Sequence, residues 1–582
     1  MIRVEHPGGC RAASRFAPGR KKLEVDVMAE IFGGQIVAKY IKEVEGIDTI
    51  FSLSGGHIAP VFDGCLDHGV RNIDVRHEQA AVMAAHAWSI FTGKPGVCLV
   101  TAGPGFTNAL TGVANAFLEN VPVVVLSGMA TIRDLDRGAL QDMNQVDMIR
   151  PVVKWIGRCY DVARIPEYLG MAFRHAVSGR PGPVFLEIPP DALYVSTEES
   201  ELKWPAKPST KYAVVPDEEA LSEALELLDG AEKPLLLGGS GIAASGAADE
   251  LRAFLEKTGM PFILMDNGRG AVPDEHPQSL WDGGLMGLLA AASMADVVFT
   301  VGIRLNWVLS FGDVLVNAKV IRLDIDSAEV DRNRQADVGL VGDARATLKL
   351  LNESVKEADR SEWLGSLKGI FAGLTETDRQ QRENPGDPIH PFYLMQQVRQ
   401  TAGDDTVYVL DGGDALYFSL MTFRATQTAG VIGSGTLFGC LGTGMPFALG
   451  AQTALPDKRV VLVTGDGSFG LNAMEFETAV RHGIPMVCVI SNDEGWGMVK
   501  HHQELCYADD RVCGTELGTI HYEKIVEALG GYGEFVDKAE GIAPAIKRAL
   551  ECGKPACVNV MTDPTVFSPA TAMFAEGFKF QQ

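Results

Sequence analysis

The sequence lacks the features that would place the protein in a membrane, in a secretory compartment or on nucleic acid. No apolar run is long enough for a bilayer-spanning helix. Its ten cysteines form no C-x-x-C pair and no regular ladder, which favours a reducing cytoplasm over secretion. Basic residues are few, with 51 Lys and Arg against 75 Asp and Glu, for a formal net charge of −24. This charge argues against nucleic acid and anionic membranes as partners.

What remains is an ordinary globular composition, with 46% hydrophobic and 22% charged residues. A length of 582 residues predicts three or four domains. Residues 1–27 are polar and basic without an apolar signal core, so we predict a disordered extension there, with the folded part opening at Met28. In so acidic a chain, a diphosphate ligand would need a metal ion or a helix N-terminus to offset the background charge.

Short apolar strands alternate with amphipathic helices from Met28 onward. The expected strands of this first part are 47–53, 72–76, 96–103 and 121–128. Between them, apolar residues recur at helical spacing, as in FTNALTGVANAFLEN. Such alternation predicts a parallel sheet covered by helices.

Two polar linkers, the first of them Pro-rich, divide the chain into three α/β units of similar size. We predict three doubly wound parallel-sheet domains, over 28–197, 213–352 and 386–566. The tail, 567–582, is apolar and aromatic for a chain end, so we expect it to dock on the protein, and it is a candidate lid.

The most informative segment begins with Gly465-Asp466-Gly467, at the end of the apolar strand RVVLVT. A helix follows, and the next apolar strand, MVCVIS, leads to Asp493 at the same edge of the predicted sheet. Carboxylates at that edge, beside the free N–H groups of a helix start, can hold a hard cation against a diphosphate. Turns of the GDG type are common alone, but the whole pattern predicts a diphosphate and Mg²⁺ site.

This pattern resembles the diphosphate-binding motif of thiamine diphosphate-dependent enzymes, and the resemblance covers essentially Met28 to Val566. It implies that Asp466 and Asp493 are metal ligands, with the Gly495 carbonyl as a third. The family normally has Asn where this chain has Asp493, which adds negative charge beside the diphosphate. The cofactor-binding positions that the resemblance implies are Gly412, Gly413, Leu441, Gly465, Gly467 and Ser468. Leu441 matches the bulky residue that supports the bent cofactor, although a plain core leucine would look the same.

A second resemblance to this family lies in Arg76-His77-Glu78, where an expected strand gives way to an Ala-rich helix. A glutamate at a helix start is usually only a favourable partner of the helix dipole. The segment RHEQAA resembles the activating-glutamate segment, which implies that Glu78 shuttles a proton at N1′ of the cofactor so that the thiazolium C2 is deprotonated. Because Glu78 and Asp466 belong to different domains, the family's arrangement implies a homodimer or homotetramer with active sites at the subunit interface.

Three further catalytic candidates follow. Segments 54–62 and 138–148 resemble benzaldehyde lyase, where a histidine and a glutamine reach the reacting carbonyl, which implies these roles for His57 and Gln141. A histidine bonded to backbone in a turn is the alternative for His57. Glu494 follows Asp493 directly, so we expect it to face the pocket above the metal and to handle a substrate hydroxyl proton. A solvated surface acid is an equal alternative.

The central domain bears on the choice of reaction. GIRLNW (302–307) and VIRLDID (320–326) resemble the nucleotide site of oxalyl-CoA decarboxylase and 2-hydroxyacyl-CoA lyase, which implies that Arg304 and Asp324 or Asp326 hold an ADP-like group. Acetolactate synthases carry FAD in this domain, so ADP and FAD both stay open. Residues 411–424 lack the A-N-T-x-D segment of the CoA enzymes and are closer to acetolactate synthase and benzaldehyde lyase.

We favour a carbon–carbon lyase that cleaves a 2-hydroxyacyl-CoA to formyl-CoA and a ketone or aldehyde. The first alternative is an acetolactate synthase-like or benzaldehyde lyase-like carboligase acting on a 2-oxo acid or an aldehyde. The second is a catalytically inactive nucleotide-binding relative. Such a relative would be expected to lose Glu78 or Asp466 first, and both are present.

Overall fold

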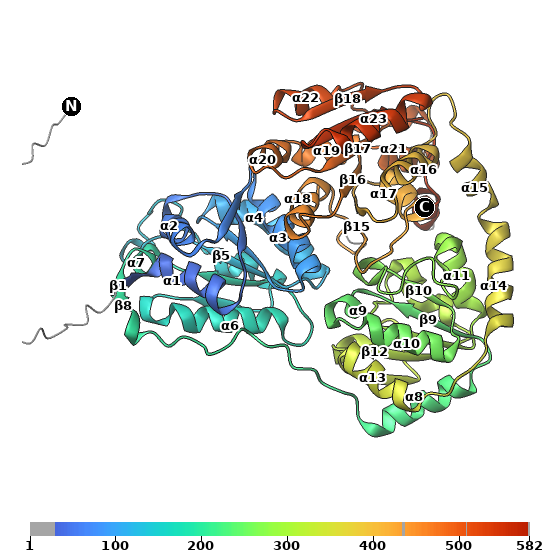
Figure 1. Ribbon diagram of the computed structural model, residues 1–582, viewed down its shortest axis with the longest axis horizontal. Coiled ribbons are helices and arrows are strands. Elements are labelled where there is room, and N and C mark those ends of the chain that lie inside the picture. The colour runs from blue at the N-terminus through green and yellow to red at the C-terminus, as the bar shows by residue number, and fades with distance from the viewer. Residues whose placement is uncertain (1–29, 434–436, 508, 580–582) are drawn as a thin grey trace, which may run out of the picture.

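The computed structural model describes residues 30–433, 437–507 and 509–579, so the predicted extension over 1–27 lies outside it. The chain forms three large sheets whose strands are all parallel, as the sequence predicts. In Figure 1 the N-terminal domain lies to the left, the third domain at the top, and the central domain below the third.

The N-terminal sheet has the order β3-β2-β4-β5-β7-β6, and the four expected strands correspond to β2 to β5. Its strands are β2 (Thr49–Ser52), β3 (Arg71–Asp74), β4 (Gly96–Val100), β5 (Val123–Ser127), β6 (Ile156–Arg158) and β7 (Val184–Glu187). Its helices are α1 (Gly33–Lys39), α2 (Ala59–His68), α3 (Glu78–Thr92), α4 (Pro104–Leu118), α5 (Gln145–Ile149), α6 (Ile165–Val177) and α7 (Pro190–Leu193). Strands β1 (Glu30–Phe32) and β8 (Ser196–Glu198) pair antiparallel beside it.

The central sheet has the order β10-β9-β11-β12-β13. Its strands are β9 (Pro234–Gly238), β10 (Phe262–Leu264), β11 (Val297–Val301), β12 (Lys319–Asp324) and β13 (Val338–Val341). Its helices are α8 (Glu218–Gly230), α9 (Ser240–Ser245), α10 (Ala248–Thr258), α11 (Gly284–Met294), α12 (Ser327–Val330) and α13 (Ala344–Ser354). Leu235 and Leu237 enter one apolar core and Leu236 the opposite one, so both faces of the sheet are covered.

Two helices form the second linker, α14 (Ser361–Leu374) and α15 (Glu376–Glu383). They run along the edge of the molecule opposite the N-terminal domain (Figure 1). Phe371 of α14 packs where Gly283 and Gly287 leave room, since a Cβ at Gly283 would lie 2.5 Å from its ring. The predicted linker is therefore partly docked on the central domain.

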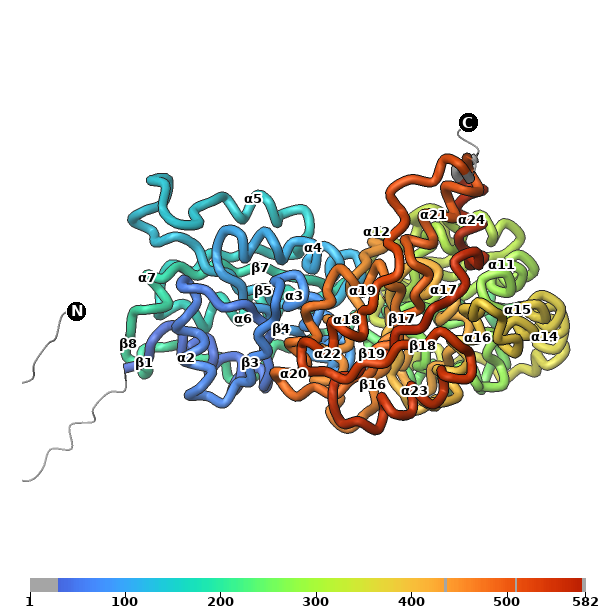
Figure 2. The backbone as a smooth tube through the Cα atoms, turned by 90° about the horizontal axis from the view of Figure 1, so that it is seen from above, coloured from blue at the N-terminus to red at the C-terminus, as the bar shows by residue number. Residues whose placement is uncertain are grey.

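The third sheet has the order β15-β14-β16-β17-β19-β18. Its strands are β14 (Val407–Leu410), β15 (Val431–Gly433), β16 (Val460–Gly465), β17 (Val487–Asn492), β18 (Tyr532–Val536) and β19 (Ala556–Met561). Its helices are α16 (Pro391–Ala402), α17 (Asp414–Thr422), α18 (Gly444–Ala454), α19 (Asp466–Asn472), α20 (Glu475–Arg481), α21 (Gly497–Cys506), α22 (Tyr522–Ala528) and α23 (Ala539–Glu551). The tail forms α24 (Pro569–Lys579), which packs beside α21 (Figure 2).

The first and third domains share one apolar core. Helix α3 lies along α18, and their buried residues belong to a single cluster. The two backbones approach closely, because a Cβ at Gly450 would lie 2.2 Å from the Ala84 carbonyl oxygen. This contact places the predicted catalytic segment at the start of α3 beside the third domain.

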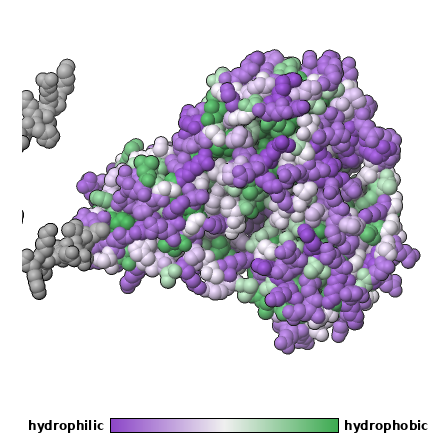
Figure 3. Space-filling model, in the orientation of Figure 1, coloured by the Kyte–Doolittle hydropathy of each residue, from purple (hydrophilic) through white to green (hydrophobic). Residues whose placement is uncertain are grey.

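The face of the molecule in Figure 3 is mainly hydrophilic, with hydrophobic residues in small scattered patches. Among the described residues, no helix is long and apolar enough to cross a membrane.

Arg269 joins the central and third domains from a buried position. It is 1% exposed, pairs with Asp274 at 2.7 Å and stacks over the Trp281 ring at 3.6 Å. It also donates hydrogen bonds to the Phe423 carbonyl at 2.6 Å and the Leu420 carbonyl at 3.3 Å. Loss of the guanidinium would leave a buried carboxylate without its cation.

We therefore expect Arg269→Ala to lower the free energy of unfolding by about 3–5 kcal/mol. Arg345→Ala, which removes an exposed pair with Glu250, should cost less than about 1 kcal/mol. Denaturant unfolding of both variants provides the measurement. Equal losses in the two variants would contradict the role given to Arg269.

Candidate functional site

The structure brings Asp466 and Asp493 to one edge of the third sheet. Asp466 begins α19 directly after β16, and Asp493 follows the last residue of β17. These two strands pair in parallel, with Gly465 opposite Ser491, so their carboxyl ends lie side by side. The residues between Asp466 and Asp493 thus form two helices and the next strand, which returns the chain to the same edge of the sheet.

The electrostatics of this pair fit a cation. Both carboxylate oxygens of Asp466 are buried and make no hydrogen bond within the described part of the chain. Burial and the neighbouring Asp493 carboxylate raise the pKa of Asp466 to about 8, and burial also raises the pKa of Asp493. Two adjacent buried carboxylates favour protonation unless a metal ion neutralises them.

No group of three or more His, Cys, Asp or Glu residues that could hold a metal is found among the described residues. An ion at Asp466 and Asp493 would therefore need other oxygens, such as the Gly495 carbonyl and the phosphates of a ligand. Magnesium is commonly bound in this way, through one or two carboxylates with phosphate oxygens and water.

A cavity of about 390 Å³ opens over this edge. The predicted cofactor-binding and metal positions that line it are Gly412, Gly413, Leu441, Gly465, Asp466, Gly467, Ser468, Asp493 and Gly495. Its aromatic side chains are Trp307, Tyr417, Phe418, Phe438, Trp496 and Phe574. No Lys, Arg or His is among its described lining residues, whose charged members are all aspartates. The cavity is thus apolar and aromatic, with negative charge at the metal end.

Glycines let the backbone close around this cavity. A Cβ at Gly467 would lie 2.7 Å from the Trp496 ring, and one at Gly413 would lie 2.7 Å from Met498. At Gly497 a Cβ would overlap Asp493 Oδ2, at 2.0 Å. Asp493 therefore lies against the backbone at the start of α21.

Glu78 lies at the N-terminus of α3 and is 5% exposed. His77 precedes it as the N-cap, and its Nδ1 accepts a hydrogen bond from the Gln79 N–H. Asn108 Nδ2 donates to Glu78 Oε2 at 2.9 Å. The sequence analysis missed Asn108, because nothing in its helical position distinguishes it from a surface asparagine.

His57 and Gln141 lie in the same domain as Glu78. Thr101 Oγ1 lies 3.2 Å from His57 Nδ1, and burial lowers the pKa of this histidine, which favours its neutral form at neutral pH. Gln141, at φ 62°, lines a separate polar cavity of about 310 Å³. None of Glu78, His57 and Gln141 is among the described residues that line the cavity at Asp466. A single chain therefore holds the predicted site in two separate parts.

Glu494 differs from the expectation. Its side chain accepts a hydrogen bond from the Thr519 hydroxyl, and it is not among the described residues lining the Asp466 cavity. Its backbone has φ 62°, and its N–H donates to Asn492 Oδ1.

A buried cluster missed by the sequence analysis holds the C-terminal segment over the cavity. Asp414 accepts hydrogen bonds from the Ser568 N–H at 2.8 Å and the Thr571 hydroxyl at 2.6 Å. His501 Nδ1 lies 3.2 Å from Asp414 Oδ2. Beyond this cluster, Phe574 packs on Trp307 with ring centroids 4.7 Å apart, and both rings line the cavity. The described part of the tail, residues 567–579, is therefore docked through Ser568, Thr571 and Phe574.

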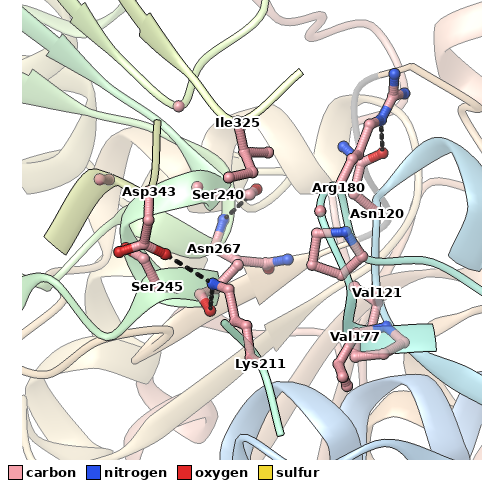
Figure 4. A pocket seen from close by; sticks show the side chains of 18 of the residues that line it. Asn120, Val121, Val177, Arg180, Lys211, Ser240, Ser245, Asn267, Ile325 and Asp343 are labelled. Carbon is pink, nitrogen blue, oxygen red and sulfur yellow. Dashed lines mark hydrogen bonds and ion pairs between the residues drawn. The ribbon is translucent and has the colours of Figure 1, made fainter. Parts of the chain in front are cut away.

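A second cavity, of about 410 Å³, lies between the N-terminal and central domains (Figure 4). Asp324 and Arg304 line it, but Arg304 donates to the Leu118 carbonyl and to Asn120 Oδ1, both at 2.6 Å. Lys211 pairs with Asp343 at 3.1 Å, also within this cavity. The other two basic lining residues are engaged as well, since Arg180 pairs with Asp326 and Glu329 and Lys94 donates to the Gly46 carbonyl.

The Gly-rich loop of the central domain also has a packing reason. A Cβ at Gly241 would lie 2.6 Å from the Gly302 Cα, so glycine is required whether or not a phosphate binds. The geometry of this cavity alone does not select ADP or FAD.

Three family models match the chain, each described as a domain of a thiamine pyrophosphate enzyme. They are the N-terminal TPP binding domain over 31–148, the central domain over 221–351 and the C-terminal TPP binding domain over 411–560. An acetolactate synthase large subunit of Mycobacterium tuberculosis is 33% identical, over 93% of this chain and 98% of the relative. A 2-hydroxyacyl-CoA lyase of Arabidopsis thaliana is 31% identical, over 92% and 96%. The acetolactate synthase isozyme 2 large subunit of Escherichia coli is 31% identical, over 91% and 95%.

We expect Asp466→Asn to weaken Mg²⁺-dependent binding of thiamine diphosphate by about 100-fold or more, because loss of even an indirect metal partner costs about 10–100-fold. Asp493→Asn should stay within about 10-fold of the wild type, since the family motif normally has Asn at this position and Asp466 then remains as the carboxylate of the pair. Quenching of tryptophan fluorescence during cofactor titration measures both, with Trp496 in the cavity as a reporter. A larger loss in Asp493→Asn than in Asp466→Asn would contradict this assignment.

The buried cluster of Asp414, His501, Ser568 and Thr571 should make docking of the tail depend on pH. His501 is 1% exposed, and its two nitrogens face acceptors, Asp414 Oδ2 and the Pro564 carbonyl. Burial opposes the charged form, but these two acceptors outweigh it and raise the pKa of His501 above 6.5. The stabilisation is therefore complete below the unfolded pKa and is lost as pH rises through the folded pKa.

We expect a carboxypeptidase to trim the tail faster at about pH 9 than at about pH 6. The rates are divided by the rate at which the protease cleaves a free peptide of the tail sequence at the same pH, which removes the pH dependence of the protease itself. His501→Gln should remove most of this pH dependence. His521→Gln, at an exposed histidine paired with Glu523, is the matched control and should keep it. Equal trimming of the wild type at both pH values would refute the prediction.

Proposed function

We propose that this chain, which belongs to the thiamine pyrophosphate (thiamine diphosphate) enzyme family, is a carbon–carbon lyase acting on a 2-hydroxyacyl thioester. The products would be formyl-CoA and a ketone or aldehyde. Membership of the family makes the chain a thiamine diphosphate-dependent enzyme, and the choice of substrate is the proposal.

The observation that carries this choice is the lining of the Asp466 cavity. A 2-oxo acid substrate brings a carboxylate, and a site for it would be expected to offer a cation or a set of aimed donors. The described lining residues provide aspartates and aromatic rings without a Lys, Arg or His. Burial lowers the pKa of His57 and so favours its neutral form, which means that His57 would not supply a cation either. This environment supports a substrate that is uncharged at the reacting carbons and carries an apolar group.

The proposed site needs two chains. Asp466, Asp493 and Leu441 would hold Mg²⁺ and the cofactor in one subunit, and Glu78, His57 and Gln141 would come from the other. The separation of these two sets within one chain supports this arrangement, with a homodimer as the smallest functional unit.

When bound, thiamine diphosphate supplies a nucleophilic thiazolium carbon and a ring that accepts the electrons of the broken bond. Glu78 would exchange a proton at the pyrimidine, which is why its burial and its bond from Asn108 matter. His57 and Gln141 would hold the substrate hydroxyl and carbonyl. In the net reaction the hydroxyl proton leaves, the C1–C2 bond breaks and the formyl carbon gains a proton, so the atoms balance.

Acetolactate synthase-like carboligation is the second candidate, because several of the relatives carry that name. It would place pyruvate in the same cavity. For the central cavity we propose an adenine nucleotide, ADP with the lyase or FAD with the synthase, lying against Asp324.

The test is an assay of the purified enzyme with Mg²⁺ and thiamine diphosphate. We expect 2-hydroxyisobutyryl-CoA to yield formyl-CoA and acetone, and Glu78→Gln to lower the rate by about 100-fold or more. Formation of acetolactate from pyruvate, without formyl-CoA from the thioester, would replace the lyase by the second candidate. Mass spectrometry of nucleotides released on denaturation checks the central cavity.

A further inference from the structure

The backbone just before Glu78 is held from outside its own domain. The N–H groups of Arg76 and His77 both donate to Glu475 Oε1, each at 3.1 Å, and Arg76 also reaches Glu475 Oε2 at 3.3 Å. Glu475 begins α20 of the third domain, more than 390 residues away in the same chain. The last sheet bond before this turn is that of the Val75 N–H to the Ser52 carbonyl. Glu475 thus takes over as acceptor where the strand partner ends and α3 has not yet begun.

The residue after Glu78 is held by the same segment of the third domain. Gln79 Nε2 donates to Asn472 Oδ1 at 3.0 Å, and Asn472 Nδ2 donates to the Gly442 carbonyl at 2.6 Å. Gly442 is next to Leu441, which lines the cofactor cavity. Both flanks of Glu78 are therefore tied to α19 and α20.

Burying the Glu475 carboxylate between the two domains costs free energy, because the charged group loses its hydration. Glu475 is 1% exposed, and its donors are the two backbone N–H groups and the Thr478 hydroxyl at 2.7 Å. No Lys or Arg forms an ion pair with it among the described residues. Burial raises its pKa to about 7, which measures this desolvation. An apolar side chain would pack the domains at lower cost, but it would leave two N–H groups at the turn without an acceptor.

We infer that Glu475 is a positioning residue for Glu78: its carboxylate fixes the backbone that presents Glu78 to the pyrimidine of the cofactor. This inference rests on the proposed role of Glu78 and does not depend on the lyase substrate. Proton exchange requires hydrogen-bond reach, about 2.6–3.2 Å between heavy atoms. A displacement of about 1 Å can cost about 100-fold in rate.

The test compares Glu475→Ala with Glu475→Gln, whose amide oxygen can still accept from both N–H groups. Two readouts are independent of any substrate. The first is amide hydrogen exchange of a peptide covering residues 74–80 in the protein without cofactor. The second is exchange of the C2 proton of bound thiamine diphosphate for deuterium, quenched with acid and read by NMR. The dissociation constant of the cofactor is measured alongside.

We expect Glu475→Ala to speed amide exchange at Arg76 and His77 and to slow C2 exchange by about 100-fold. Cofactor affinity should change less than about 10-fold, because the diphosphate end binds at Asp466, away from Glu475. Glu475→Gln should restore both readouts to within about 10-fold of the wild type.

Arg481→Ala is the matched control. Arg481 is also on α20 and joins the same two domains by donating to Asp74 Oδ1 at 2.6 Å and the Asp74 carbonyl at 2.7 Å, but it does not bond to residues 76–79. Equal slowing of C2 exchange in Arg481→Ala, or failure of Glu475→Gln to restore the exchange, would overturn the inference. Either result would mean that Glu475 only packs the two domains together. Unchanged amide exchange in Glu475→Ala would also overturn it. Failure of the wild type to bind cofactor would instead sink the proposed function.

Discussion

The rest of the site depends on two carboxylates buried side by side at the ends of neighbouring parallel strands. Asp466 has no hydrogen-bond donor in the described structure, and Asp493 lies against Gly497. Like charges this close favour protonation, and only a cation allows both to ionise. Because the protein would supply few oxygens to such a cation, phosphate oxygens of a ligand and water would complete its shell. We propose that this acidic chain binds a diphosphate through a metal ion, where another protein would use lysine or arginine.

The third domain also holds the segment of the N-terminal domain that carries Glu78. Helix α19 begins at the edge that carries Asp466, and its last residue, Asn472, lies with the first residue of α20, Glu475, beside the start of α3. These two residues hold both flanks of Glu78, while α18 packs along α3 itself. One continuous segment thus joins the carboxylate pair of a chain to the backbone around Glu78 of the same chain. In the proposed two-chain site, each chain would present a prearranged Glu78 to its partner.

The sequence predicted features whose physical cause is local. The three parallel sheets and the pair Asp466 and Asp493 follow from alternation of strands and helices and from the spacing of strand ends. The position of the Glu494 side chain could not be predicted from local sequence. It depends on a left-handed φ at Glu494 and on the hydrogen bond from Thr519, 25 residues further on. Arg304 lines the central cavity, but nothing in the sequence indicated its bonds to Leu118 and Asn120 of another domain. Asn108 and Glu475 were missed for the same reason, since their partners are remote in sequence.

Specificity has to be argued from the few residues that face the substrate. Relatives named for two different reactions are 33% and 31% identical over nearly the whole chain, so overall similarity does not separate them. Trp307 and Phe574 meet over the cavity from the central domain and the tail, two regions outside the metal motif. A ring pair in the lining of the cavity favours an apolar group. Substrate choice can therefore change without disturbing the carboxylate pair, because the two sets of residues lie on different elements.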